Sequence, residues 1–490
     1  MSANAVNHGW QDWKLPLVFA ALKLALHFLT NTNYGFHRDE FLYLALGERL
    51  TWGYMEVPPV IAVFGKLALS LGGQLFVVRL FPALIGSVTV FLLGVMVKDL
   101  GGKKWAQSFA CLAFIISPAF MRSNTLFQPV SFDQFCWFLS AFFIVRLVKY
   151  QQPQYWFYLG IVAGLGFLTK YSIVFFYAAF FLALLLTPQR RWLKTKYPYF
   201  ALGITLLIAL PNLIWQYQHN LPVLKHMAEL SQTQLQHVQA LNFLQTQLRF
   251  HWAALLIWLP GLLYLLLSEK LSAYRIFGFI YLFIIFIFMG LKGKGYYALG
   301  AYPMLMAAGG IAVENFLKNK MAALKPALAF LLIVLTIPLL PYGLPVISIQ
   351  NMQRYWGWMK DNLNFVGPLR WEDGKIHTLP QDYADMFGWE EMAAKVGKLY
   401  HGLSPAEQQS CMIYGGGYAH ASSINYYRKK YNLPEACSFN GSFLMWAPDS
   451  AQFDRQIMID DVLQTPSSFF VSMQLVDSVQ TPYAREKGYI

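Results

Sequence analysis

Charge is scarce in this 490-residue sequence: only 13% of the residues are Asp, Glu, Lys or Arg, while 56% are hydrophobic and 17% are aromatic. The mean hydropathy of +0.39 lies well above that of ordinary soluble domains. Runs of about 20 apolar residues recur, which is long enough to cross a hydrocarbon core about 30 Å thick. The composition therefore excludes a chain of soluble domains and predicts a polytopic α-helical membrane protein.

Acidic residues are scarcer than basic ones, 25 against 38, so the formal net charge is +13. The basic residues gather in alternate loops, for example within 98–104, 190–196 and 318–325, whereas the short loops between carry few. The positive-inside rule assigns the basic loops to the cytoplasm. The sequence thus predicts a cytoplasmic N-terminus and an extracytoplasmic C-terminal segment, and it argues against nucleic acid as a partner.

The first apolar run lacks the small-residue cleavage site of a signal peptide, and Lys23 and His27 interrupt it, so we expect a retained anchor. The chain also shows no internal repeat. The apolar pattern predicts about eleven spanning helices. Their expected centres lie near Leu24, Ser87, Leu112, Ser140, Val162, Phe181, Ile208, Leu259, Phe283, Met306 and Val334.

Three longer segments are expected on the outer side, at about 32–74, 216–250 and 346–490. The first contains the amphipathic stretch "DEFLYLALGERL", which predicts interfacial helices. We therefore expect a transmembrane domain at 1–345 and a soluble domain at 346–490. Within the latter, "DMFGWEEMAAKVGKLYHGLS" and "AHASSINYYRKKY" predict helices, while "CMIYGGG" and "SSFFVSM" resemble strands, which is typical of an α/β domain.

The sequence has only four cysteines, two of which, Cys111 and Cys136, fall in apolar spans where they are expected to be buried side chains. Cys411 and Cys437 share the C-terminal segment, and an oxidising compartment would permit a disulfide between them. Spacing alone leaves both outcomes open.

Ionisable groups near a membrane need a reason, because each costs about 2.5 to 3.5 kcal/mol at a helix centre. His37, Arg38, Asp39 and Glu40 stand side by side after the first apolar run. Further charges occur at predicted outer ends of spans: Glu56, Arg122, Asp133, Lys170, Lys225, His226, Lys292 and Lys294. Anchoring of an interfacial helix or snorkelling from a helix end would explain some of them singly. Their common position favours a site at the outer membrane surface.

Four stretches carry a resemblance to a known family: "FHRDEFLYLALGERLTWGYMEVPP", "GLGFLTKYS", "GKGYYALGAYPMLMAAGG" and "LPQDYADMFGWEEMAAKV". They resemble bacterial glycosyltransferases of the protein O-mannosyltransferase and aminoarabinose-transferase superfamily, which are family-39-type members of the GT-C fold. The resemblance runs from the first predicted helix to about Pro448. Its motifs are specific for the family and much less so for the substrate.

The resemblance implies transfer of a sugar from a polyprenyl-phosphate carrier to an extracytoplasmic lipid, protein or polysaccharide, usually with inversion, by a multi-pass enzyme of the bacterial cytoplasmic (inner) membrane. The family's catalytic acid maps onto Asp39, and Glu40 is the neighbouring carboxylate that we include with it. Lys294 and Tyr297 match a Lys and a Tyr associated with the carrier phosphate.

The resemblance also implies a candidate metal ligand, because Glu56 matches a Glu that binds a divalent metal ion in relatives. His226 is a second candidate ligand, and no other cofactor is implied. Two positions depart from the family: Val57 replaces a Lys, and Gln128 stands at a second acidic position. The latter departure weakens a two-carboxylate mechanism unless Asp133 substitutes.

The expected chemistry needs a base and fixed positive charge. An acceptor hydroxyl that attacks an anomeric carbon must lose a proton, which a carboxylate can take, and the leaving phosphate gains negative charge that cations stabilise. The candidates for the donor phosphate are Arg122, Lys170, Lys292, Lys294 and Tyr297. The candidates for the acceptor and sugar pocket are His37, Arg38, Tyr54, Tyr296 and Gln128.

Two other functions stay open on the sequence alone. A transporter or flippase of lipid-linked sugars would also need many spans and phosphate-binding cations, although it predicts a two-fold repeat. An inactive relative that binds a lipid-linked glycan is compatible with Val57 and Gln128.

Overall fold

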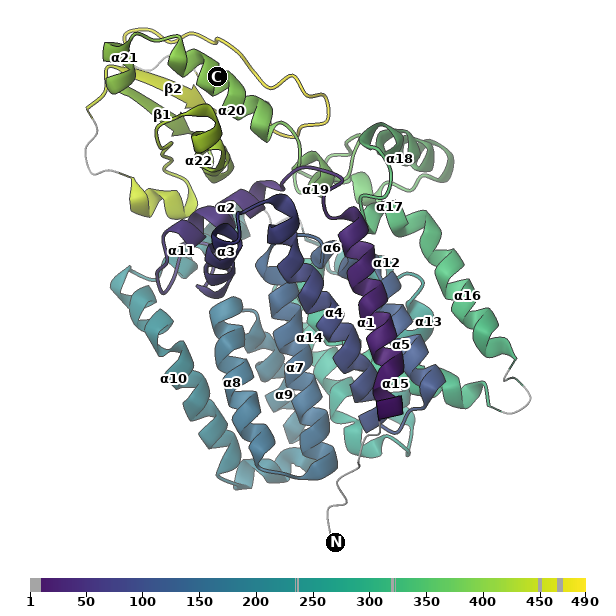
Figure 1. Ribbon diagram of the computed structural model, residues 1–490. Helices are drawn as coiled ribbons and strands as arrows, with labels where there is room; N and C mark the ends of the chain where they lie inside the picture. Colours follow the sequence, from purple (N-terminus) through teal and green to yellow (C-terminus); the bar gives the residue numbers. More distant parts are fainter. Residues whose placement is uncertain are drawn as a thin grey trace. The chain divides into compact units, whose positions relative to one another are not determined.

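A computed structural model (Figure 1) describes residues 10–490 except 234, 236–237, 319–320, 322, 448–451 and 465–469. The chain forms two compact units. We call the first, Met1–Asn31 with Arg79–Val346, the membrane unit, and the second, Thr32–Val78 with Ile347–Ile490, the mixed unit. The sequence prediction placed the loop at 32–74 in the same domain as the spans. In the structure this loop belongs to the same compact unit as the C-terminal residues.

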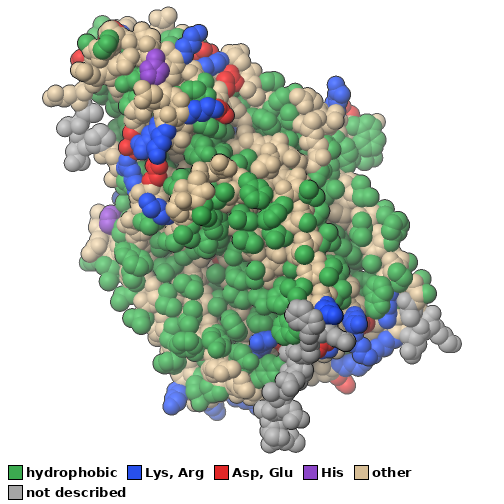
Figure 2. All heavy atoms as spheres, in the orientation of Figure 1, with side chains coloured by type: hydrophobic (Ala, Val, Ile, Leu, Met, Phe, Trp, Pro, Cys, Tyr) green, Lys and Arg blue, Asp and Glu red, His purple; other side chains and the backbone are tan. Residues whose placement is uncertain are grey.

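The membrane unit consists of helices. They are α1 (Trp10–Thr30), α4 (Leu75–Asp99), α5 (Lys104–Ile116), α6 (Pro118–Ser123), α7 (Pro129–Tyr150), α8 (Gln154–Thr169), α9 (Ile173–Leu185), α10 (Tyr197–Gln218), α11 (Pro222–Thr233), α12 (Ala240–Phe250), α13 (Leu255–Leu267), α14 (Ile276–Gly290), α15 (Tyr302–Phe316), α16 (Leu324–Thr336) and α17 (Leu340–Gly343). Hydrophobic side chains cover the visible sides of these helices (Figure 2).

Each of the eleven expected centres lies within one of these helices. The number of spans is not confirmed, however: among the described residues, seven helices are long and apolar enough to cross a membrane, or up to nine if each bent pair is one span. The bent pairs are α9 with the 3-10 helix η1 (Pro188–Lys194), at 106°, and α12 with α13, at 112°. The fold is nevertheless that of a multi-pass membrane protein, as predicted.

Polar side chains inside the membrane unit bind backbone and hydroxyl groups of neighbouring helices. Lys23 Nζ in α1 donates a hydrogen bond to the carbonyl oxygen of Phe120 in α6 (3.0 Å), and His27 Nδ1 lies 3.3 Å from Thr125 Oγ1. Both Lys23 and His27 are fully buried. These contacts explain why two polar residues interrupt the first apolar run: they attach α1 to the short helix after the break at Pro118.

Glycine permits the closest helix packing in this unit, between α13 and α15. A Cβ atom on Gly309 would lie 1.9 Å from the carbonyl oxygen of Ile257, and one on Gly261 would lie 2.0 Å from that of Leu305. Lipid-exposed helices gain no hydrophobic free energy from associating, so close backbone approach supplies much of the attraction.

The mixed unit contains α2 (Arg38–Glu48) and α3 (Val60–Ser70) from the first loop, which confirms helices in this segment. The C-terminal residues form α18 (Ile349–Leu363), α19 (Gln381–Ala384), α20 (Trp389–His401), α21 (Pro405–Gln409), α22 (Tyr418–Tyr431), β1 (Cys411–Gly415) and β2 (Arg455–Ile459). The strands are parallel, in a register that runs from Cys411 opposite Arg455 to Gly415 opposite Ile459. The connection between parallel strands includes α22, as a crossover requires.

The C-terminal sequence patterns are mostly confirmed. The strand "CMIYGGG" and the two helices appear as β1, α20 and α22. Of "SSFFVSM", residues 467–469 lie outside the described residues, and Phe470–Met473 form no strand, so that prediction is wrong for the described part. Cys411 and Cys437 are both free thiols.

We predict that Gly309→Ala lowers the melting temperature of the detergent-solubilised protein by several degrees, because the added methyl forces α13 and α15 apart. Gly203→Ala in α10 is the matched control, since a Cβ there meets nothing within 4 Å and alanine favours a helix over glycine. Equal melting temperatures for the two variants would contradict the packing argument.

Candidate functional site

Two motifs more than 300 residues apart interlock in the mixed unit: "NYGFHRDE" before and within α2, and "LPQDYADMFGW" around α19. The backbone N–H of Arg38 donates to the carbonyl oxygen of Asp385 (3.1 Å), and the rings of Tyr34 and Tyr383 meet edge to face at 5.3 Å. A Cβ on Gly35 would lie 2.5 Å from the carbonyl oxygen of Met386, so this approach requires glycine. The first turn of α2 is therefore fixed by the C-terminal residues.

His37 and Glu40 form a capping box at the start of α2. His37 Nδ1 accepts a hydrogen bond from the backbone N–H of Asp39 (3.2 Å), and Glu40 Oε2 accepts one from the backbone N–H of His37 (2.8 Å). Glu40 is fully buried. Glu40 thus has a structural role as part of the helix cap. The sequence had suggested a catalytic role for it.

Asp39 lies in the first turn of α2, and its side chain is 25% exposed. Its Oδ1 accepts a hydrogen bond from the hydroxyl of Tyr418 (2.8 Å), which belongs to the first turn of α22. Burial, together with the negative charge of Asp39, raises the pKa of Tyr418 well above its usual value, so the phenol stays protonated and donates. Arg38 packs its guanidinium over the Tyr418 ring, at 5.2 Å, and pairs with Glu486.

Sequence reasoning missed Tyr418. It stands in "GGGYAHAS", where nothing distinguishes it from the 27 other tyrosines, since the chain has 28. Only the packing of α2 against α22 brings it to Asp39.

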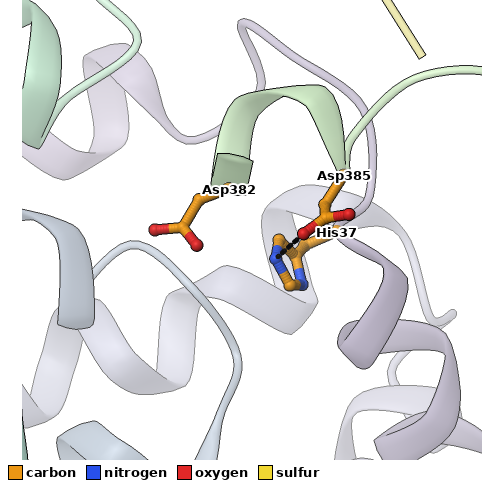
Figure 3. Close-up of side chains that lie close together, drawn as sticks. All are labelled: His37, Asp382 and Asp385. Atoms are coloured by element: carbon orange, nitrogen blue, oxygen red, sulfur yellow. Dashed lines mark ion pairs between the residues drawn. The ribbon is translucent and has the colours of Figure 1, made fainter. Parts of the chain in front are cut away.

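His37 also faces a buried carboxylate from α19 (Figure 3). Its Nε2 lies 3.6 Å from Asp385 Oδ2, and both Asp385 oxygens lie 3.2 Å from Arg485 Nη1. Burial raises the pKa of Asp385, although the charges of His37, Arg485 and Arg38 oppose this shift. The resulting network holds the N-terminus of α2 in place and fixes the orientation of the His37 imidazole.

Two groups of side chains have the ligand types of a metal site: His37, Asp382 and Asp385, drawn in Figure 3, and His420, Asp461 and Glu486. In each group the histidine Nδ1 accepts a backbone N–H, from Asp39 and from Gly417, respectively. An imidazole whose Nδ1 accepts in this way carries a proton on Nε2, the atom that faces the carboxylates.

Such an arrangement does not fit a metal ion, because a metal-bound imidazole must offer a lone pair at Nε2 and donate from its other nitrogen. The arrangement instead fits a histidine whose Nε2–H points to a carboxylate. Around Asp461, burial would raise the pKa, but the His420 imidazole 3.4 Å away and the backbone N–H of Gly488 lower it below its usual value. We therefore assign both groups to charge pairing.

The expected metal ligands occupy different places. Glu56 accepts hydrogen bonds from the backbone N–H (2.7 Å) and the hydroxyl of Ser442 in the mixed unit, whereas His226 lies half-buried in α11 of the membrane unit. Among the described residues, neither belongs to a group of three metal-ligating side chains. The residues present thus do not fit a metal at Glu56.

Tyr54 does not line an open pocket, contrary to expectation. Its side chain is buried, and its hydroxyl contacts the carbonyl oxygen of Arg49 (2.9 Å) and accepts from the backbone N–H of Thr51 (3.1 Å). It closes the C-terminal end of α2, because the hydroxyl satisfies backbone groups that the helix end leaves unpaired.

Three residues expected at the donor phosphate, Lys170, Lys294 and Tyr297, come together with Tyr296, which was expected in the sugar pocket, in the membrane unit. Lys170, at the C-cap of α8, places Nζ 5.0 Å from the ring centroid of Tyr296 and 4.9 Å from that of Tyr297, while Lys294 Nζ lies 6.0 Å from the Tyr296 ring. Cation–π contacts of this kind hold an ammonium group without neutralising its charge. We call these four residues the lysine–tyrosine group.

One carboxylate interacts with this group. Asp133 in α7 is buried, accepts hydrogen bonds from Ser172 Oγ (2.7 Å) and Trp137 Nε1 (3.1 Å), and interacts electrostatically with Lys170. The ammonium groups of Lys170 and Lys294 are of the kind that stabilise an anion. Because both Asp133 oxygens already accept hydrogen bonds, the structure favours a structural role for Asp133 over the second catalytic carboxylate.

The other expected residues of the membrane unit lie outside this group. Lys292 is exposed, with a left-handed φ of +52°. Arg122 is buried in α6, and Gln128 is the half-buried N-cap residue of α7. The expected site residues therefore divide between the two units, with Asp39 in one and the lysine–tyrosine group in the other.

Sequence comparison supports the resemblance over part of the chain. Residues 56–215, about a third of the sequence, match the family described as dolichyl-phosphate-mannose-protein mannosyltransferase. A lipid A galacturonosyltransferase, RgtD of Rhizobium johnstonii, is 27% identical over 198 residues, which are 40% of this chain and 41% of the relative. The chain thus matches less than half of that relative's length.

Structural comparison covers most of the chain. The crystal structures of ArnT from Cupriavidus metallidurans, bound to undecaprenyl phosphate and in the apo state, match with TM-scores of 0.57 and 0.56 at 15% identity. Each match covers 86% of this chain. The matches cover 85% of the ArnT chain bound to undecaprenyl phosphate and 84% of the apo chain. At this identity the likeness shows the fold, so the GT-C fold that the motifs implied is confirmed.

Proposed function

We propose that this protein is a membrane glycosyltransferase that moves a sugar from a polyprenyl-phosphate carrier to an extracytoplasmic acceptor. The observation that carries the proposal is the partly exposed carboxylate of Asp39, which the partly buried Tyr418 holds at the start of α2. The lysine–tyrosine group supplies positive charge for a phosphate. The similarity to a mannosyltransferase family, to one galacturonosyltransferase sequence and to an ArnT structure bound to undecaprenyl phosphate supports the same reaction class.

Asp39 acts as the general base in this proposal. As the acceptor hydroxyl oxygen forms a bond to the anomeric carbon, the carboxylate takes the hydroxyl proton, and the bond from that carbon to the phosphate oxygen breaks on the opposite face. The products are the glycosylated acceptor, with inverted configuration, and the polyprenyl phosphate. General base catalysis of this type contributes roughly 10²- to 10⁴-fold.

Lys170 and Lys294 stabilise the phosphate that leaves. Negative charge grows on this group in the transition state, and preorganised cations lower the barrier because they need no rearrangement. Tyr296 and Tyr297 restrain the ammonium groups through their ring faces. The polyprenyl tail remains in the bilayer, which explains why these residues belong to the unit that spans it.

The proposed acceptor is a glycolipid of the cell envelope, and the proposed sugar is a hexose, a uronic acid or a pentose. The acceptor class rests on the relative whose name states that it modifies lipid A. The proposed location is the bacterial inner membrane, with a cytoplasmic N-terminus and the C-terminal segment outside, as the loop charges predict.

Asp39→Asn is expected to reduce transfer from the carrier-linked sugar at least a hundredfold while the melting temperature stays the same, because the amide cannot accept the proton. Transfer is measured as release of polyprenyl phosphate by purified protein in proteoliposomes. Glu48→Gln, at the exposed end of the same helix, is the matched control and should keep full activity. Near-normal turnover by Asp39→Asn would remove this residue from the mechanism.

Tyr418→Phe is expected to lower kcat about tenfold and leave KM for the carrier-linked sugar unchanged. The loss of one hydrogen bond frees the Asp39 carboxylate to rotate, and a misoriented base slows only the chemical step. Tyr427→Phe on the same helix is the control, because the ring contacts of Tyr427 are with Phe41, Tyr426 and Tyr431. A raised KM at constant kcat would assign Tyr418 to substrate binding instead.

Lys170→Ala and Lys294→Ala are each expected to raise KM for the carrier-linked sugar about tenfold and to lower kcat as well, since both lysines contact the same phosphate in the ground and transition states. Lys292→Ala removes the same charge two residues from Lys294 but outside the group, so its KM should change less than twofold. If all three variants behave alike, general surface charge rather than this geometry attracts the carrier.

A further inference from the structure

A second feature of the membrane unit is unrelated to the proposed catalytic residues. A cavity of about 410 Å³ lies where α1 begins, α4 ends and α5 and α16 begin. Four lysines line it, and Trp105 adds an aromatic side chain. The lysines are Lys98, Lys103, Lys104 and Lys325.

The two acids that line this cavity already have hydrogen-bond partners. Asp12 Oδ1 accepts a hydrogen bond from Lys98 Nζ (2.8 Å). The Glu314 carboxylate accepts three backbone N–H groups at the start of α5, from residues 103, 105 and 106, at 3.0 to 3.3 Å. It therefore balances the positive end of that helix rather than a lysine.

Three lysines of the cavity, Lys103, Lys104 and Lys325, consequently have no carboxylate partner among the residues that the structure describes. Lys103 and Lys104 are exposed, and Lys325 is partly exposed. A concave site with three uncompensated ammonium groups attracts an anion, and phosphate is the anion that lysine commonly binds as a point charge.

The cavity lies at the membrane–water boundary. Candidate spans begin at Asp12 and Leu324 and end at Asp99, so the lining lysines stand at span ends. Trp105 is a residue type enriched at this depth. In Figure 2, Lys and Arg side chains gather at the lower edge of the hydrophobic side chains of this unit.

This face is opposite to that of Lys170. Asp99 Oδ1 at the end of α4 accepts a hydrogen bond from Lys149 Nζ near the end of α7 (2.9 Å), so α4 and α7 end on one face. Helix α8 starts there, at Gln154, and runs to Lys170 at the other face. The cavity therefore does not belong to the lysine–tyrosine group.

We propose that this cavity binds the phosphate headgroup of an anionic phospholipid of the surrounding leaflet. A basic pocket between spans, at the face that the loop charges predict to be cytoplasmic, is the environment in which such headgroups bind. The lysines contact the phosphate, and Trp105 contacts the glycerol region. This binding does not depend on the proposed glycosyl transfer.

The expected strength follows from the number of lysines. Each lysine near an anionic headgroup strengthens binding about fivefold, so loss of all three weakens it roughly a hundredfold. If net charge alone attracted the lipid, the loss of affinity would depend only on the number of charges removed and not on their position.

The test measures apparent Kd values for phosphatidylglycerol and phosphatidylcholine by native mass spectrometry of the full-length protein in detergent. Three proteins are compared: the natural sequence, the triple variant Lys103→Gln, Lys104→Gln, Lys325→Gln, and a control variant. The control, Arg190→Gln, Arg191→Gln, Lys194→Gln, removes the same charge from η1. The natural protein should prefer phosphatidylglycerol, the triple variant should lose this preference, and the control should retain it.

The proposal would be overturned if the triple variant still preferred phosphatidylglycerol. It would also be overturned if the control variant lost as much affinity for phosphatidylglycerol as the triple variant. Displacement of phosphatidylglycerol by inorganic phosphate at equal concentration would show a free-anion site and would also overturn it. Should the triple variant fail to fold, the single Lys325→Gln variant replaces it, with an expected fivefold loss, and an unchanged Kd there counts against the site. Lys325→Arg should retain binding.

Discussion

Helix α2 spans only Arg38–Glu48, and a helix of this length is marginal in water unless other elements hold it. The position of the proposed base therefore depends on contacts that α2 makes with C-terminal residues. The backbone of Arg38 bonds to that of Asp385, and Tyr418 bonds to Asp39. The residues that follow α17 thus become part of the framework of the first loop, which explains why these residues form one compact unit.

The sequence predicted the helices of the membrane unit well because lipid imposes a simple rule on length and polarity. It predicted their number less well, since α12 and α13 meet at 112° and α5 has only 13 residues, and no hydropathy pattern reveals such bends. The sequence also did not predict that residues 32–78 form one compact unit with the C-terminal residues. That grouping arises from contacts between residues more than 300 positions apart.

The candidate site was predictable where residue type and motif sufficed. Asp39 and the pair Lys170 and Lys294 were selected as candidates this way, and the structure gives each a defined set of contacts. The role of Glu40 had a local signal, a Glu three residues after the cap, but His37 is not among the usual capping residues, so the box was missed. Tyr418 had no local signal, because its contact with Asp39 exists only in the tertiary structure.

The type of partner that holds Asp39 bears on its chemistry. A guanidinium bonded to a carboxylate favours the charged form strongly and makes it a poorer base, whereas a neutral phenol orients it with a smaller loss of basicity. Arg38 stands next to Asp39 in the sequence, yet it pairs with Glu486 and packs on the Tyr418 ring. The network around α2 therefore pairs the Arg38 guanidinium with Glu486, while the Tyr418 hydroxyl orients the Asp39 carboxylate that must accept a proton.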